Sequence, residues 1–250
     1  MIPKIIHYCW FGGNPKPALA KKCIKSWKKY CPDYELREWS EETFDIQSAP
    51  LYVRQAYDCK KWAFITDYVR LWAMYNFGGI YMDTDVEVLK ELDLFLDNKA
   101  FSGFESEDAV PTGIMASEKG NVMVEELLHY YDERSFIVNG EPDITPNTVI
   151  ITEMMLPHGL VLNNQYQTVN TFSLYPKEYF CPIYPGQVKV TITENTYTIH
   201  HFSGSWLPIE EQKDKMRSMK EQKRKNRNKA LLHFYKNTKH KIKIAVTNKK

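Results

Sequence analysis

The sequence predicts an α/β fold in which helices cover both faces of a mainly parallel, mixed sheet. A chain of 250 residues is long enough for one large α/β domain. Its first forty residues follow the order strand, helix, strand, which is typical of an open parallel sheet. The hydrophobic share of 43% and the charged share of 26% are average for globular chains. This composition excludes disordered, collagen-like and fibrous classes.

The first three elements follow from the spacing of apolar residues. Residues 2–11 are rich in apolar side chains and end at Gly12-Gly13, which predicts a buried strand followed by a loop. Residues 17–30 carry apolar residues at helical spacing and lysines on the other side. Residues 34–39 alternate between polar and apolar, as a second strand does.

The next elements form a helix, a stop and two strands. Residues 60–77 predict the longest helix, which Gly78-Gly79 ends. Residues 80–82 and 86–89 predict strands, with Asp83-Thr84-Asp85 between them. Further along the chain we expect a helix at 145–155 and a β-pair made of 188–193 with 196–200.

Charge divides the chain into two expected parts. Residues 213–250 hold 15 Lys/Arg against 2 Asp/Glu, a net of +13, so the remaining 18 basic and 29 acidic residues give residues 1–212 a net of −11. We therefore expect a domain at 1–212 and a basic tail at 213–250 that is helical or flexible. Such a tail suits a solubilising extension or an anionic membrane surface, and the chain shows no nucleic-acid-binding module to favour that third partner.

The sequence favours a cytoplasmic chain that is soluble or peripheral at the inner face of the membrane. Five scattered cysteines without a C-x-x-C pair suggest neither a disulfide framework nor a thiolate zinc site. The first eight residues lack the features of a secretory signal, and no stretch approaches the roughly 20 apolar residues that a membrane span needs.

Two carboxylates after a predicted strand are the first candidate for chemistry. Asp83 and Asp85 are separated by one residue, so both side chains can reach one hard divalent cation, or a cation and a ribose hydroxyl. An isolated Asp-x-Asp is more often a solvated turn. Here it follows a helix, a Gly-Gly stop and an apolar strand, which favours a metal and diphosphate site.

The preceding helix carries a charged pair. Asp67 and Arg70 are three residues apart and share a helix face otherwise rich in apolar and aromatic side chains. A structural ion pair would explain them. The alternative is that they face a cleft, where a carboxylate and a guanidinium can bind sugar hydroxyls and phosphate.

Taken in order, these motifs resemble the DXD-containing glycosyltransferases of family 32, whose sugar-binding region is shared by the glucosylating bacterial toxins. The resemblance covers residues 2–96 closely and residues 100–195 only loosely. The matching segments are IPKIIH at 2–7, WFG at 10–12, DYVR at 67–70, GGIYMDTD at 78–85 and HHFSGSW at 200–206.

The resemblance implies a GT-A fold, a nucleotide-sugar donor, a Mn²⁺ or Mg²⁺ cofactor and transfer with retention of the anomeric configuration. It also implies roles for residues of the first motifs. Trp10 would stack on the nucleobase, Asp67 and Arg70 would hold the donor sugar, and Tyr81 would line the donor pocket. Asp83 would contact ribose or metal-bound water, and Asp85 would ligate the metal.

The closing motif adds a metal ligand and two donor contacts by the same resemblance. His201 stands where relatives place a ligand, and Ser205 and Trp206 would reach the diphosphate or the donor. By the resemblance, the toxins use a carboxylate at the position of His201, and a histidine nitrogen favours Mn²⁺ over Mg²⁺. As an alternative, His200 or His201 is a packed, hydrogen-bonded histidine, and Trp206 belongs to the core.

The expected function is a metal-dependent hexosyltransferase that uses a nucleotide-sugar, with UDP favoured, and a surface polysaccharide or lipid-linked oligosaccharide as acceptor. Two other classes stay open. An aspartyl phosphatase also starts from a strand followed by Asp-x-Asp, although it wants Thr or Val where this chain has Glu87. A glycan- or membrane-binding module on an inactive transferase fold is the non-enzymatic alternative. Neither a catalytic base, nor the acceptor, nor the linkage is evident from the sequence.

Overall fold

The computed structural model describes residues 1–111, 113–183, 190–204 and 217. All of these except Arg217 belong to one compact unit. The predicted boundary between residues 212 and 213 lies outside the described residues, and so does nearly all of the predicted tail.

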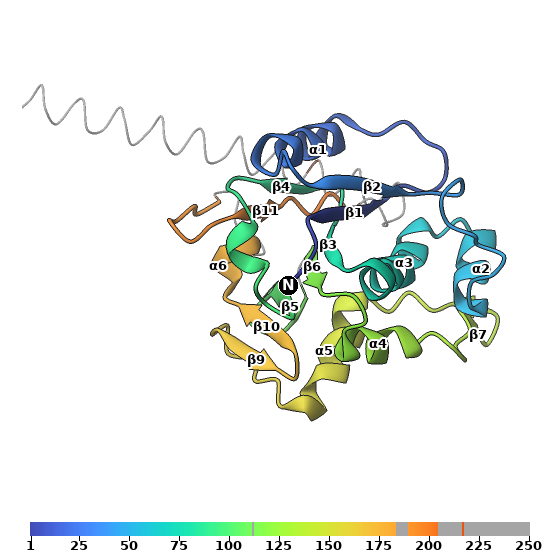
Figure 1. Ribbon diagram of the computed structural model, residues 1–250. Coiled ribbons are helices and arrows are strands. Elements are labelled where there is room, and N and C mark those ends of the chain that lie inside the picture. Colours follow the sequence, from blue (N-terminus) through green and yellow to red (C-terminus); the bar gives the residue numbers. More distant parts are fainter. Residues whose placement is uncertain (112, 184–189, 205–216, 218–250) are drawn as a thin grey trace, which may run out of the picture. The chain divides into compact units, whose positions relative to one another are not determined.

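A seven-stranded mixed sheet forms the centre of this unit (Figure 1). In spatial order it runs β2 (Glu35–Trp39), β1 (Ile5–Cys9), β3 (Gly79–Met82), β6 (Ile114–Ser117), β5 (Ala100–Gly103), β10 (Phe172–Tyr175) and β9 (Gln167–Val169). Five strands share one direction, and β6 and β9 run against them. The predicted α/β class with a mainly parallel mixed sheet is therefore confirmed.

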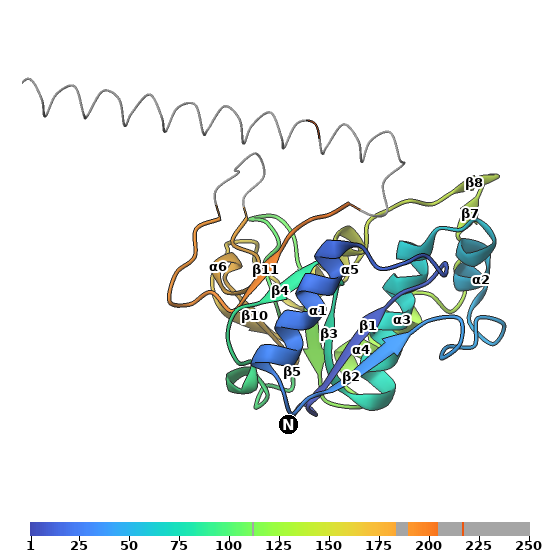
Figure 2. The same cartoon turned by 90° about the horizontal axis from the view of Figure 1, so that it is seen from above.

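Helices cover both faces of this sheet. One face packs against α2 (Leu51–Asp58), α3 (Trp62–Phe77), α4 (Val122–His129) and α5 (Asn147–Met155), the last continued by η2 (Leu156–His158). The other face packs against α1 (Ala18–Tyr30), η1 (Asp93–Phe95) and α6 (Lys177–Phe180). Figures 1 and 2 show α1 and α3 on opposite sides of β1 and β3. Because side chains alternate along a strand, Ile6 and Tyr8 enter one core and Cys9 enters the other.

Two small antiparallel pairs complete the fold. Strand β4 (Val86–Val88) pairs with β11 (Thr198–His200), and β7 (Ile137–Val138) pairs with β8 (Glu141–Pro142). The predicted pairing of 188–193 with 196–200 is wrong, since residues 190–193 are irregular and β11 pairs with β4 instead. Residues 188 and 189 lie outside the described residues.

The two glycines after α3 allow the chain to enter β3 at once. Gly78 and Gly79 have φ of +67° and +112°, a region that side chains with a Cβ rarely adopt. A Cβ on Gly79 would lie 2.8 Å from the backbone oxygen of Ile5 in the neighbouring strand. The buried His7 side chain ties this junction to β1, because its Nε2 lies 2.8 Å from the Gly78 oxygen. The helix stop and the strand start are thus fixed by backbone geometry.

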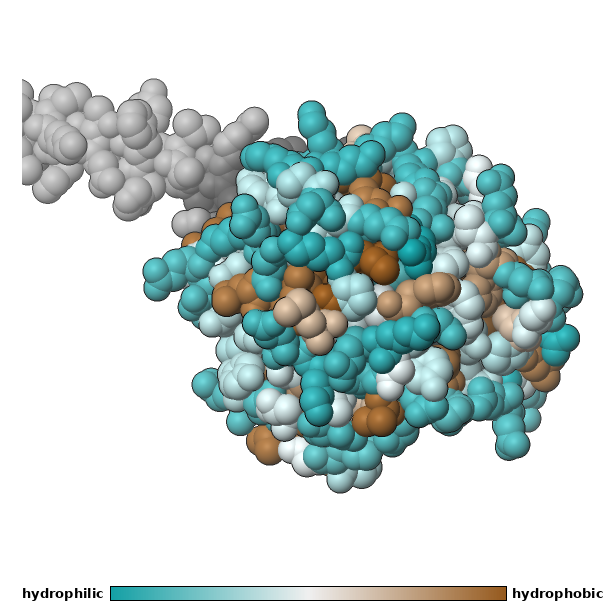
Figure 3. All heavy atoms as spheres, viewed as in Figure 1, coloured by the Kyte–Doolittle hydropathy of each residue, from teal (hydrophilic) through white to brown (hydrophobic). Residues whose placement is uncertain are grey.

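Figure 3 shows the face of the molecule at which β1 begins, near the chain's first residue. Hydrophilic side chains cover most of this face, and hydrophobic ones form small separate groups between them. Single exposed apolar residues are normal for a globular surface. The candidate site described next lies instead where β3 ends.

Candidate functional site

The Asp83–Asp85 segment forms a turn directly after β3. The backbone N–H of Val86 donates to the Asp83 oxygen at 2.9 Å and closes the turn. The N–H of Asp83 donates to the Gly113 oxygen at 2.8 Å, which holds the turn against the chain that leads into β6. The predicted position of both aspartates at a strand end is therefore what the structure shows.

The structure brings His200 to these two aspartates. Its Nε2 lies 3.3 Å from Asp85 Oδ1 and 3.9 Å from Asp83 Oδ2. One ligand atom from each of the three residues lies within 4.8 Å of the others. Pairing of β11 with β4 places His200 opposite Val86, the residue that follows the aspartates. A local turn and a distant strand thus meet at one point.

His201, which the resemblance assigns as a metal ligand, faces another carboxylate. Its Nε2 lies 2.9 Å from Glu87 Oε2, while its backbone N–H donates to the Asp85 oxygen at 3.0 Å. Consecutive residues at the end of a strand point to opposite sides. With His200 directed at the aspartates, His201 is directed away from them.

The donor atoms of Asp83, Asp85 and His200 fit a divalent cation. Carboxylate oxygens and an imidazole nitrogen together suit Mn²⁺ and related ions. Burial would by itself raise the pKa of Asp85, but hydrogen bonds with His200 and Ser203 outweigh it and hold that pKa well below its usual range. Burial likewise opposes charge on His200, but the hydrogen bond with Asp85 and the nearby carboxylate charges raise its pKa well above the usual value. A protonated His200 therefore offsets the carboxylate charges, and cation binding would release that proton.

Asp67, Arg70 and Tyr81 join the aspartates in one network. The Arg70 Nη2 lies 3.1 Å from Asp67 Oδ1 and 3.3 Å from Asp83 Oδ1, so one guanidinium bridges α3 to the turn. The Tyr81 hydroxyl donates to Asp83 Oδ1 at 2.9 Å, and the Arg70 guanidinium lies 4.7 Å from the centre of the Tyr81 ring. The three residues that the resemblance places at the donor sugar are thus adjacent in space.

Burial of the Asp67 carboxylate in this network is energetically unfavourable. Asp67 is 7% exposed, and the Arg70 guanidinium that pairs with it also pairs with Asp83. Burial raises the pKa of Asp67 to about 7, even though Arg70 favours its ionised form. Strongly perturbed carboxyl groups of this kind are concentrated at functional sites.

The loop after β11 contacts Asp85. The N–H of Ser203 donates to Asp85 Oδ2 at 2.7 Å, and Phe202 before it has a φ of +49°. The Phe202 ring also lies 4.1 Å, centre to centre, from the His200 ring. Ser205 and Trp206, which follow Gly204, lie outside the described residues, so their predicted donor contacts stay predictions.

Trp10 stands just beyond the end of β1 and is partly exposed. Its indole N–H donates to the Asn14 oxygen at 2.6 Å, and the Lys16 ammonium lies 5.6 Å from its ring centre. The structure thus places Trp10 at the same end of neighbouring strands as Asp83. Its predicted stacking on a nucleobase stays a prediction.

Sequence reasoning missed Glu105, which lies beside His200, and Lys177, which contacts Glu105. Glu105 follows β5, and its Oε2 lies 3.8 Å from His200 Nδ1; burial raises the pKa of its carboxyl. Lys177 of α6 is 1% exposed, and its Nζ donates to the backbone oxygen of Glu105. The signal available in the sequence was an acidic residue directly after the apolar run at 100–104.

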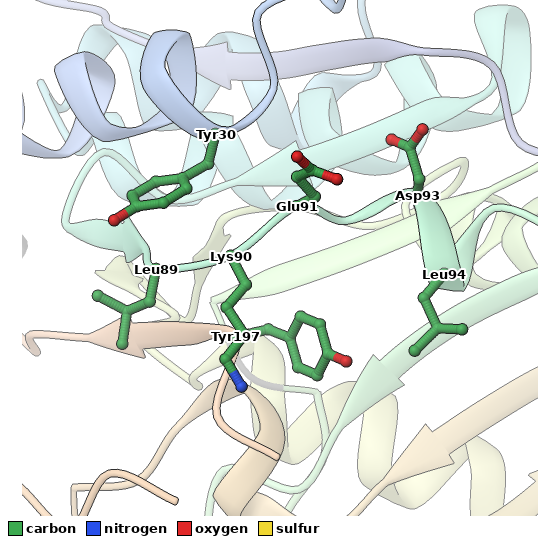
Figure 4. Close-up of a pocket in the computed structure, with 7 residues that line it drawn as sticks. All are labelled: Tyr30, Leu89, Lys90, Glu91, Asp93, Leu94 and Tyr197. Atoms are coloured by element: carbon green, nitrogen blue, oxygen red, sulfur yellow. The ribbon is translucent and has the colours of Figure 1, made fainter. Parts of the chain in front are cut away.

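A separate hollow of about 440 Å³ lies beside η1 (Figure 4). It is lined by Tyr30, Leu89, Lys90, Glu91, Asp93, Leu94 and Tyr197. None of these seven is a predicted site residue. The charged network around Asp83 is therefore the stronger candidate for chemistry.

The Asp-x-Asp turn after β3, the histidine at the end of β11 and the buried Asp–Arg pair of α3 thus form one charged cluster. Residues 17–102 match the family described as "Glycosyltransferase sugar-binding region containing DXD motif". The match includes Asp67, Arg70, Tyr81 and both aspartates of the motif. This match confirms the resemblance stated from the sequence, and the structure confirms the α/β fold with a mainly parallel mixed sheet.

Comparison with known proteins gives further likenesses. Inositol phosphoceramide mannosyltransferase 3 of Schizosaccharomyces pombe is 33% identical over 124 residues, which cover 48% of this chain. The match spans only 34% of that relative's length.

Two solved structures are more distantly similar. The PaToxG glycosyltransferase is 18% identical, with a TM-score of 0.46 over 62% of this chain and 68% of that one. A glycosyltransferase involved in glycosylation of the major capsid of PBCV-1 is 15% identical, with a TM-score of 0.47 over 86% of this chain and 100% of that one.

Within the part of the chain that the structure describes, no helix combines the length and the apolar character required to cross a membrane.

Proposed function

We propose that this protein transfers a hexose from a nucleotide-sugar to a glycan, with Mn²⁺ or Mg²⁺ as cofactor. The observation that carries the proposal is the meeting of Asp83, Asp85 and His200 beside the Asp67–Arg70 pair. Four of these five residues lie inside the matched sugar-binding region, and His200 reaches them from the far end of the domain. Family and geometry thus support the same reaction class.

The chemistry explains the residue types. Cleaving a sugar–phosphate bond leaves a diphosphate that gains negative charge, and a divalent cation held by Asp83, Asp85 and His200 would supply the charge that stabilises it. Without such a cation, two carboxylates would repel the donor. Arg70 and Asp67 offer a guanidinium and a carboxylate for sugar hydroxyls and phosphate. Tyr81, packed under Arg70, fixes the guanidinium in place.

For the donor we propose a UDP-linked hexose and transfer with retention, as the resemblance implies. The mannosyltransferase name of the Schizosaccharomyces pombe relative supports a hexose as the transferred sugar. The acceptor is proposed to be a surface polysaccharide or a lipid-linked oligosaccharide. We propose a location in the cytoplasm, at the inner face of the membrane. The +13 charge of residues 213–250 supports the membrane part of this proposal, because it suits an anionic surface where such acceptors lie.

A thermal-shift panel with UDP, GDP and CDP, each with and without Mn²⁺, tests the site, the cation and the base together. We expect one nucleotide, UDP, to raise the melting temperature only when Mn²⁺ is present, because a ligand that binds only the folded state stabilises it. Asp85→Ala should abolish this shift and the hydrolysis of UDP-hexoses while the protein stays folded. Asp97→Ala, an exposed aspartate outside the site, is the matched control.

The same measurements separate the rival classes. Hydrolysis that survives Asp85→Ala would reject the assigned cation site. A phosphoryl group trapped on Asp83 would indicate an aspartyl phosphatase instead. Glycan binding that a chelator leaves unchanged, together with no response to any nucleotide, would indicate a non-catalytic binding module.

A further inference from the structure

The second ring nitrogen of His200 is the least satisfied polar atom next to the site. Nε2 faces Asp83 and Asp85, whereas Nδ1 is buried and meets no hydrogen-bond partner at normal distance among the described residues, although the Cys181 side chain also interacts with the imidazole. A buried polar atom without a hydrogen-bond partner is unfavourable. A hydrogen-bond acceptor beside Nδ1 would therefore stabilise the Nδ1–H form of the ring.

Glu105 is the carboxylate that faces this nitrogen. Its Oε2 lies 3.8 Å from Nδ1, which is longer than a hydrogen bond. On another side of the ring, Gly113 approaches so closely that a Cβ there would lie 3.0 Å from Nδ1. The imidazole is thus confined between a backbone without a side chain and an acidic side chain.

The backbone of Glu105 is held by two contacts. Its N–H donates to the Ala109 oxygen at 2.9 Å, and its own oxygen accepts from the buried Lys177 ammonium. The distance of 3.8 Å between Glu105 Oε2 and His200 Nδ1 exceeds a normal hydrogen-bond length of about 2.9 Å by about 1 Å.

The state of Nδ1 decides whether Nε2 can bind a cation. A neutral imidazole carries its proton on one nitrogen, and only the Nδ1–H form presents a free electron pair at Nε2. In metal sites, the partner of the non-ligating nitrogen selects this form, and a carboxylate is a common partner.

We propose that Glu105 is a positioning residue for the cation site: its carboxylate accepts a hydrogen bond from His200 Nδ1–H and so directs the Nε2 electron pair toward the cation held with Asp83 and Asp85. Glu105 itself does not touch the cation. The inference rests on the proposed function in one respect, the presence of a divalent cation at this site.

The test is the affinity of the full chain for Mn²⁺ alone, measured from the free Mn²⁺ signal in electron paramagnetic resonance. We expect Glu105→Gln to weaken binding by about 10–100-fold, the usual cost of losing such a partner. The control Glu107→Gln removes the same charge from an exposed position two residues away and should change the affinity less than twofold.

A double-mutant cycle shows whether Glu105 acts through His200. In a His200→Ala background, Glu105→Gln should have no further effect on Mn²⁺ affinity, because the group that it positions is gone. An equal loss in both backgrounds would mean that Glu105 acts as a ligand or as a general charge, and would overturn the proposal. So would an unchanged affinity of Glu105→Gln in the otherwise native chain.

Failure of the proposed function looks different. If the native chain itself does not bind Mn²⁺, the cation site and this inference fall together, whereas native binding with unaltered Glu105→Gln rejects the inference alone. Ring ¹⁵N shifts of the native protein with Zn²⁺, a diamagnetic probe, give a readout that does not depend on how a variant folds. We expect a protonated Nδ1 on His200, and a protonated Nε2 would overturn the proposal.

Discussion

A single guanidinium serves two carboxylates in the candidate site. Arg70 Nη2 lies within 3.3 Å of both Asp67 and Asp83, and Arg70 and Asp67 are nearly inaccessible to solvent. Buried ion pairs often cost as much in desolvation as they return in attraction. Asp67 is the member for which the balance is unfavourable, since burial raises its pKa to about 7. The proposed contact of Asp67 with the donor, rather than stability, would account for a carboxylate at this position.

Asp67→Asn is therefore expected to stabilise the protein and impair its activity. The pKa of Asp67 is about 7 in the folded protein and 3.8 in the unfolded chain. The unfolded chain therefore loses this proton at a lower pH than the folded protein does. Ionisation of Asp67 then lowers stability as the pH rises from about 4 to 7, and asparagine removes this loss. At pH 8 we expect the free energy of unfolding in urea to increase by about 2–4 kcal/mol. The UDP and Mn²⁺ thermal shift should become smaller.

The control is Asp97→Asn, which removes a carboxylate from an exposed position. It should leave both the pH dependence of unfolding and the nucleotide response unchanged. A loss of stability in Asp67→Asn at pH 8 would show that Asp67 is a structural partner of Arg70, the alternative considered from the sequence.

At the scale of elements, the junction between α3 and β3 sets the position of the aspartates. Gly79 begins the strand, and Asp83 follows its last residue, Met82. A side chain on Gly79 would meet the backbone of Ile5 and the His7 ring. Any shift of β3 away from β1 would be passed to the turn that carries the aspartates.

Gly79→Ala should accordingly cost more stability than an alanine at another glycine of positive φ. Gly120 has a φ of +70° and open space around its Cβ position, so Gly120→Ala reports the backbone strain alone, about 1–2 kcal/mol. Gly79→Ala adds a clash of 2.8 Å with a backbone oxygen, and we expect a total loss of about 3 kcal/mol or more. Urea unfolding followed by circular dichroism measures both. Equal losses would show that β3 adjusts without cost.

At the scale of the whole molecule, the site depends on segments far apart in the chain. Asp67 and Arg70 come from α3, the aspartates from the turn after β3, and His200 from β11. The antiparallel register of β11 with β4 is the contact that delivers His200. The family match ends at residue 102, so β11 and His200 lie outside the matched region.

The uneven charge leads to a prediction for the full chain. If residues 213–250 attach the protein to anionic membranes, a chain of residues 1–212 should lose co-sedimentation with phosphatidylglycerol vesicles, because each nearby Lys or Arg contributes about 1 kcal/mol. The shortened chain should keep the nucleotide response that depends on Asp85.

Binding of the full chain should also weaken with added salt and be absent on phosphatidylcholine vesicles. Equal sedimentation of both chains would reject a membrane role for this tail and leave the solubilising role.

Local patterns in the sequence were enough for the first part of the fold. The strand at β1, the helix α1 and the strand β2 follow from side-chain periodicity, which depends only on neighbours in the chain. The ends of α3 and β3 follow from Gly78-Gly79, because positive φ is a local requirement. The Asp-x-Asp motif and the helical pair Asp67 and Arg70 were evident for the same reason.

Only the tertiary structure decided which distant residues meet these motifs. The pairing of β11 with β4 placed His200 beside the aspartates and turned His201 toward Glu87. A shift of one residue in that register would exchange the two histidines, and no local pattern fixes it. Glu105 became a candidate only through its distance to His200. The sequence by itself thus determined the acidic turn and the elements around it, whereas non-local strand pairing determined the remaining members of the site.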